Sequence, residues 1–157
     1  MSKIKVADFY YGAVLSMLFS HGINPALIEN SDDRQVYDFT TNKNKFRLFV
    51  KYRAMKQNTK REDYNSWLFT IAQDTSEIQS YIDNGANIIL GLVCGSDNLA
   101  ESELAVLDTE QIRQILVLEK SSITISRKKG ERAFRISMGG GRDEALQVKC
   151  NRFEELL

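Results

Sequence analysis

The sequence predicts an α+β fold in a single domain, with a mixed β-sheet flanked by helices. Three observations support this prediction. The chain has 157 residues, 43% of them hydrophobic, which suits one buried core better than two. Apolar residues recur at helical spacing in some segments and alternate with polar residues in others. The chain shows no internal repeat, and neither its single proline nor its one glycine run, Gly139–Gly141, makes a linker long enough to divide it.

The first predicted elements are one helix and two strands. Apolar side chains recur every three or four residues over Val6–His21, which is typical of an amphipathic helix. The segment Ala26–Glu29 follows a proline and is expected to add only a short turn. Arg34–Thr40 and Lys45–Arg53 are predicted strands, and the polar residues Thr41–Asn44 have the composition of the turn between them.

A third strand, a helix and a buried strand follow a polar loop at Lys56–Asn65. The strand is predicted at Trp67–Ile71. The helix is predicted over Ser76–Asn84, because Asp74 with Glu77 fits a capping box in which the Asp74 side chain caps the helix. A nearly continuous apolar run then covers residues 87–94, and this favours a strand buried on both faces.

The last third of the sequence is expected to be rich in β-strands. A strand at Glu103–Leu107 precedes a second capping box at Asp108, which opens a short helix ending near Leu116. Two further segments, Ser122–Arg127 and Arg132–Met138, flank a polar turn and predict a hairpin. Leu146–Cys150 is the last predicted strand. The prediction is therefore a core of about residues 6–95 with a β-rich extension of about residues 103–157.

The residue inventory excludes several kinds of site. One histidine and two distant cysteines cannot form an ordinary structural zinc site, so we expect no metal and no cofactor. Neither a P-loop nor a GxGxxG pattern is present, which leaves nucleotide binding without support. The first residues lack the pattern of a signal peptide, and no apolar run is long enough to cross a bilayer. We expect a cytoplasmic protein with no membrane partner.

The net charge of zero, 21 basic against 21 acidic residues, hides a strong segregation along the chain. Eight basic residues and no acidic one lie between Lys43 and Arg61. Eleven acidic residues and only Arg113 as a base follow over positions 62–119, and six bases against Glu131 alone follow over positions 120–135. A polarised surface is therefore possible, and the acidic block offers a surface for a protein partner.

The strand Lys45–Arg53 has the clearest alternation in the chain, with Phe46, Leu48, Val50 and Tyr52 predicted to face the core. Its other face would then present bases around one aromatic ring. Basic rows hold phosphate backbones and an aromatic ring can stack on an unpaired base, so this face is a candidate for DNA or RNA binding. A merely solvated sheet face is the alternative. The candidate nucleic-acid-binding residues are Arg47, Phe49, Lys51, Arg53, Lys56, Lys60, Arg61, Arg127, Lys128 and Lys129.

The predicted order of helix, three strands, helix and strand resembles the αβββαβ core of restriction-endonuclease-like (PD-(D/E)XK) nucleases. In that family a carboxylate on one strand and a D/E-x-K triplet on the next bind Mg²⁺, and the lysine assists the attacking water. The resemblance places Asp38 at the first acid and Lys51 at the lysine. Phe49 stands where the second acid would be, and a phenyl ring cannot bind a metal. The resemblance therefore implies a degenerate catalytic site.

Three hypotheses for the function follow. The preferred one is a non-catalytic nucleic-acid-binding domain that uses the basic strand face. The second is a small protein-interaction regulator or inhibitor of bacterial or phage origin, which would dock a partner through the acidic block or the basic strand. The third is a Mg²⁺-dependent nuclease with Asp38 and Lys51 as its catalytic residues, the only case in which a cofactor is expected.

Overall fold

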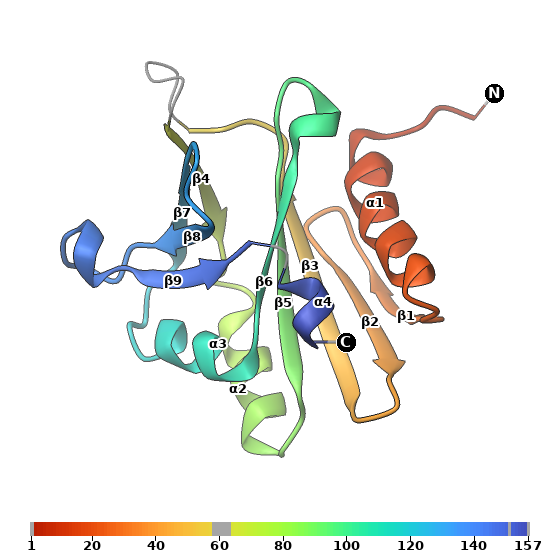
Figure 1. Ribbon diagram of the computed structural model, residues 1–157. Coiled ribbons are helices and arrows are strands. Elements are labelled where there is room, and N and C mark those ends of the chain that lie inside the picture. The colour runs from red at the N-terminus through yellow and green to blue at the C-terminus, as the bar shows by residue number, and fades with distance from the viewer. Residues whose placement is uncertain (1, 58–63, 151, 157) are drawn as a thin grey trace.

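The computed structural model describes residues 2–57, 64–150 and 152–156, and within them it confirms an α+β fold (Figure 1). The strands form two sheets. Sheet A has the order β1-β2-β3-β5-β6 and is mixed, because β3 and β5 run parallel while the other neighbours are antiparallel. Its strands are β1 (Ala26–Asn30), β2 (Gln35–Thr40), β3 (Lys45–Arg53), β5 (Ile88–Cys94) and β6 (Glu103–Leu107).

Sheet B is antiparallel and has the order β4-β7-β8-β9. The β7–β8 pair confirms the predicted hairpin, with Ile125 opposite Ile136. Gly130 in its turn has a φ of 87°, a conformation that L side chains rarely adopt and that glycine takes freely. The strands of this sheet are β4 (Tyr64–Thr70), β7 (Ser122–Lys128), β8 (Ala133–Ile136) and β9 (Leu146–Lys149).

Helices cover sheet A on both faces (Figure 1). On one face α1 and α4 pack against a core that contains Tyr10, Leu48 and Val50. On the other face α2, α3 and sheet B enclose a second core that contains Phe49 and Trp67. The helices are α1 (Val6–Ser20), α2 (Thr75–Asp83), α3 (Thr109–Leu116) and α4 (Phe153–Leu156), with 3₁₀ turns at Leu99–Glu101 and Arg142–Glu144.

Strand β3 is the centre of this arrangement. It is hydrogen-bonded to β2 on one side and to β5 on the other, and its side chains enter a different core on each face. The predicted alternation of this strand is confirmed, since Leu48 and Val50 face the α1 side and Phe49 faces the opposite side. Both faces are covered, however, so neither of them is the solvated face that the sequence predicted.

Two other predictions about the sheets are wrong. Ala26–Glu29 belongs to an edge strand, β1, which pairs with β2 and does not end as a turn. The strand predicted at Trp67–Ile71 does not join the sheet of β3, because β2 and β5 already occupy both edges of β3. It pairs with β7 instead, from Tyr64 opposite Lys128 to Thr70 opposite Ser122. The predicted single sheet is therefore divided into two.

The two predicted capping boxes have different outcomes. Asp108 accepts a hydrogen bond from the Gln111 backbone N–H at 2.8 Å and so caps α3 as predicted. Asp74 stands at the N-cap of α2, but its side chain makes no capping hydrogen bond. Two basic side chains take its carboxylate oxygens instead.

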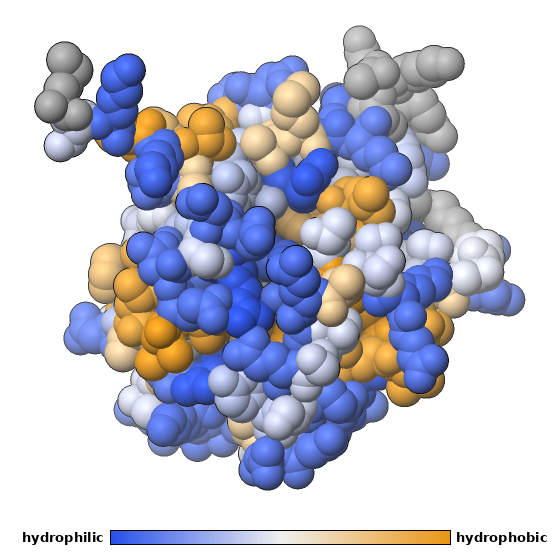
Figure 2. All heavy atoms as spheres, turned by 180° about the vertical axis from the view of Figure 1, so that it is seen from behind, coloured by the Kyte–Doolittle hydropathy of each residue, from blue (hydrophilic) through white to orange (hydrophobic). Residues whose placement is uncertain are grey.

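The surface view shows where polar and apolar residues lie on the outside. The face opposite to that of Figure 1 is largely hydrophilic, and its hydrophobic residues form separate patches (Figure 2). Among the described residues, none of the helices has the length and apolar character needed to cross a membrane.

Candidate nucleic-acid interface

The predicted binding face of β3 is buried. Phe49 has no exposed surface, because α2, α3 and sheet B cover this side of sheet A. Lys51, two residues along the same face, is only 9% exposed. A ring inside the core cannot stack on a base, so the predicted solvent-facing row of Arg47, Phe49 and Lys51 is wrong.

Lys51 lies in a buried ion pair. Its Nζ donates a hydrogen bond to Oδ2 of Asp74 at 2.8 Å, and Asp74 itself is 4% exposed. The other oxygen of Asp74, Oδ1, accepts a hydrogen bond from Nη1 of Arg34 at 2.8 Å. Burying charges is costly unless they are paired, and here one carboxylate satisfies two cations. This pairing is the physical reason why Asp74 does not cap α2.

Arg34 connects this pair to two further acids, Glu29 and Glu77, whose side chains are partly exposed. Together Arg34, Lys51, Asp74, Glu29 and Glu77 are called the buried charge cluster, after the buried Lys51–Asp74 pair at its centre. The Arg34 guanidinium bonds Glu29 on β1 at 2.6 and 2.9 Å and Glu77 on α2 at 2.5 Å. It also lies 5.2 Å from the ring centre of Phe49. The hydrogen bond from Arg34 lowers the pKa of Glu29. The cluster therefore connects β1, β3 and α2, and its basic side chains are paired with acids of the same cluster.

Arg47 is engaged in the same way at the other end of β3. It forms two hydrogen bonds with the Asp38 carboxylate, at 2.7 and 2.8 Å, and its guanidinium lies 4.7 Å from the ring centre of Tyr81. These hydrogen bonds lower the pKa of Asp38 against a smaller opposing effect of burial. Arg47 is thus a partner of Asp38 and Tyr81 within the fold, which limits its use for binding phosphate.

The predicted catalytic pair of Asp38 and Lys51 is not brought together. Asp38 lies opposite Arg47 in the β2–β3 register, and Lys51 follows Arg47 by four residues, or about 13 Å along a strand. Each of the two side chains has another partner, Arg47 and Asp74 respectively. Over the residues that the structure describes, no group of three or more His, Cys, Asp and Glu side chains could hold a metal ion.

The structure does bring one residue of the first basic block, Lys56, to the end of sheet B that carries the second block. Lys56 donates a hydrogen bond to the Asn65 side chain at 2.9 Å, and Asn65 lies opposite Arg127 on β7. Lys128 ends β7, and Lys129 lies in the turn to β8. Their side chains are exposed, as is that of Arg132 on the far side of the same turn. We call Lys56, Lys128, Lys129 and Arg132 the basic end.

The remaining predicted residues fall into three situations. Arg53 is exposed at the end of β3, where it lines a cavity together with two acids, Asp32 and Asp33. Arg127 points back toward β6, where it forms an ion pair with Glu103 at 3.4 Å and lies over Phe134. Lys60 and Arg61 lie outside the described residues.

The buried charge cluster was not predicted from the sequence. For the cluster the only signal, an acid at Asp74, was the one already used to predict a helix cap. Comparisons with family models, with curated proteins and with solved structures find no match for this chain.

Proposed function

We propose that this chain binds nucleic acid through the basic end of sheet B. The observation that carries the proposal is the pairing of β4 with β7, which sets Tyr64 opposite Lys128 and Asn65 opposite Arg127. Through the hydrogen bond between Lys56 and Asn65, this pairing sets Lys56 beside bases that lie about 70 residues later in the sequence. The basic end keeps its charges at the surface, whereas Arg47 and Lys51 are paired within the fold.

The chemistry of the basic end suits a phosphate backbone. Lysine and arginine side chains that neutralise phosphates release condensed counterions, and this release drives binding without regard to sequence. Within the described residues no ion pair engages Lys128, Lys129 or Arg132. The acid in the same turn, Glu131, forms an ion pair with Arg135 at 3.3 Å, which reduces its effect on a phosphate nearby. Backbone binding with little sequence preference is the expected mode.

The test is a charge reversal with a charge-matched control. The variant Lys128→Glu/Lys129→Glu/Arg132→Glu changes three exposed residues of the basic end. The control Lys43→Glu/Lys45→Glu/Lys120→Glu changes the net charge by the same amount at exposed residues outside the basic end. Fluorescence anisotropy with labelled duplex DNA, single-stranded DNA and RNA measures the affinity at several salt concentrations.

We expect the parent and the control to bind at least one of these probes with an affinity that falls steeply with salt. The basic-end variant should bind about a hundredfold more weakly at 0.1 M salt, with a log–log salt slope smaller by about 3, close to one for each lost phosphate contact. Equal weakening by the control would assign the effect to net charge and contradict the proposed site. Cleavage of the probe when Mg²⁺ is added would move the chain to the nuclease class.

A further inference from the structure

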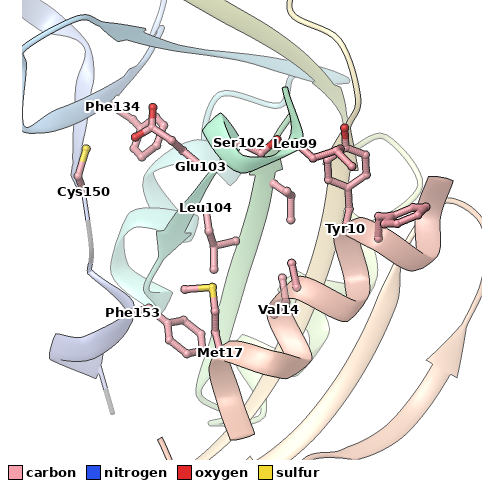
Figure 3. A pocket seen from close by; sticks show the side chains of 13 residues that line it. Tyr10, Val14, Met17, Leu99, Ser102, Glu103, Leu104, Phe134, Cys150 and Phe153 are labelled. Carbon is pink, nitrogen blue, oxygen red and sulfur yellow. The ribbon is translucent and has the colours of Figure 1, made fainter. Parts of the chain in front are cut away.

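A second surface, distinct from the basic end, is an apolar groove on the α1 side of sheet A. Its cavity has a volume of about 370 Å³. In Figure 3 the side chains of Tyr10, Val14 and Met17 on α1 face Leu104 on β6 and Phe153 on α4. The β5–β6 loop closes the upper end of the groove with Leu99 and Ser102.

The walls of the groove leave apolar side chains in contact with solvent. Phe9 is 49% exposed, Met17 is 37% exposed and Leu99 is 49% exposed. Exposing apolar surface to water costs about 25 cal/mol per Å². Single exposed apolar residues are common on protein surfaces, but several of them gathered in one groove indicate a binding site. The groove exists because α1 and α4 both lie on this face of sheet A without filling the space between them.

The chain already places a helical turn of its own at one end of this groove. Helix α4 has a single turn, and it directs Phe153 and Leu156, three residues apart, into the core on this face. Arg152, just before α4, holds it to the body of the protein through Asp108 and Gln111. Of these two residues Phe153 also lines the groove, so this face of sheet A accepts apolar residues at helical i, i+3 spacing, the spacing that a helix presents to a groove.

The borders of the groove are acidic. Asp97 and Glu101 are exposed on the β5–β6 loop on either side of Leu99, and Glu154 and Glu155 are exposed beside Phe153. Glu103, which lines the groove, is paired with Arg127, and this ion pair compensates most of its negative charge. Glu155 is likewise paired, with Arg152 at 4.0 Å. Asp97, Glu101 and Glu154 give the rim a negative potential, which favours a partner with positive charge around its apolar contact.

We infer that this groove binds an amphipathic helix of a partner protein, with an apolar stripe on the floor and lysines or arginines against the acidic rim. The α1 wall from Phe9 to Met17 is about 12 Å long, or about two turns of a bound helix. Apolar anchors at i, i+3, i+4 and i+7 would fill this length. The inference is independent of nucleic-acid binding, because it uses none of the residues of the basic end.

The probe for the test is a synthetic peptide of about 18 residues, with leucine and phenylalanine on one helical face and lysine and arginine on the other. A second peptide keeps the apolar face and carries glutamate in place of every base. Fluorescence anisotropy of the labelled peptides measures binding to the full chain. The alkylation rate of Cys150, a half-buried thiol in the groove lining, reports whether the peptide occupies the groove, and the buried Cys94 is the internal control.

Two variants separate the contributions of the walls and of the rim. Phe9→Ser/Met17→Ser removes partly exposed wall residues and should weaken the basic peptide at least about tenfold. Asp97→Lys/Glu101→Lys reverses the rim and should weaken it about fivefold at low salt, with the difference shrinking at high salt. The matched control Asp83→Lys/Glu110→Lys reverses two exposed acids on α2 and α3 and should leave the affinity unchanged.

Several results would overturn the inference. The first is that the basic peptide does not bind at about 1 mM, the weakest affinity of interest. The second is that the acidic peptide binds equally well, and the third is that the alkylation rate of Cys150 is unchanged by the peptide. Self-association of the parent that is lost in Phe9→Ser/Met17→Ser would give the groove to a second copy of this chain instead. Nucleic-acid binding measured on the same variants should stay at the parent level, so failure here and failure of the proposed function are distinguishable.

Discussion

The basic residues of β3 and those of the β7–β8 turn have similar chemistry but opposite environments. Arg47 and Lys51 project from the middle of a sheet that is covered on both faces, and each is paired with a carboxylate. Lys128 and Lys129 lie where a strand ends and a turn begins, and they are exposed. Position in the sheet, and not the density of basic residues, decides which charges are available to a partner.

The difference has an energetic origin. A charge that leaves water needs a close partner and further hydrogen bonds to balance the cost of desolvation. The buried charge cluster meets this need with two cations on one carboxylate and two more acids on Arg34. Charged side chains in an exposed turn need no such partner, because solvent remains around them. Substitutions in the two regions should therefore differ most in their effect on stability.

The largest expected effect is that of Asp74→Ala. This change leaves Lys51 buried without its carboxylate and removes one of the acids from Arg34. Removing one partner of a buried ion pair costs about 3–5 kcal/mol, so we expect a loss of this size in the free energy of unfolding. Equilibrium urea denaturation measures it. The exposed Asp83 on the same helix is the control, and Asp83→Ala should lie within about 0.5 kcal/mol of the parent.

A loss below about 1 kcal/mol for Asp74→Ala, the range of an exposed pair, would mean that the cluster does not behave as buried charges in solution. The double variant Lys51→Met/Asp74→Ala sharpens the test. Because it removes the cation together with the anion, it should recover part of the stability that the single variant loses. Failure to recover any stability would place the cost in the contact between Asp74 and Arg34 alone.

A smaller effect is expected in the pH dependence of stability. Hydrogen bonding by Arg47 lowers the pKa of Asp38 in the folded state. A lowered pKa adds stability above the unfolded pKa of about 3.9, and that stability is lost as the pH falls through the folded value. Arg47→Met should therefore flatten the acid side of the stability profile measured by urea denaturation between about pH 6 and pH 2.5.

Lys45→Met is the matched control for this measurement. Lys45 lowers the pKa of Asp38 only through its charge, and its effect on that pKa is smaller than that of Arg47. Its profile should stay close to that of the parent. An NMR titration of the Asp38 carboxyl gives a direct readout, since its pKa should rise in Arg47→Met. An unchanged pKa in that variant would show that the Asp38–Arg47 pair does not form in solution.

The smallest expected effect on stability is that of Lys128→Met/Lys129→Met in the exposed β7–β8 turn. Both side chains are exposed, so the free energy of unfolding should stay within about 0.5 kcal/mol of the parent for each substitution. The same variant should bind nucleic acid more weakly, because two phosphate contacts are lost. A marked loss of stability would show that the turn contributes to the fold and would separate it from the binding role.

Much of the fold could be predicted because its signals are local. The span of α1, the Asp108 cap of α3 and the β7–β8 hairpin each depend on residues a few positions apart. The alternation in β3 also predicted which residues share a face. What covers each face is a non-local property, and the row of Arg47, Phe49 and Lys51 has the same pattern whether it meets solvent or a second core.

The candidate site was predictable only in part for the same reason. Lys128 and Lys129 are exposed as a turn requires, whereas the partner of Lys51 is 23 residues away at the N-cap of α2. No spacing rule connects a helix cap to a strand in this way. The position of Lys56 beside the β7–β8 turn also depended on which strand pairs with β7, and the sequence does not specify this pairing.

The central place of β3 has a consequence for how the molecule unfolds. This strand contributes Phe49 to one core and Leu48 and Val50 to the other, so neither core can open while the other keeps its native packing. We therefore expect one cooperative unfolding transition, with both cores lost together. The backbone amides of β3 and β5 should exchange with solvent only through this global opening, and they should be the slowest-exchanging amides of the chain.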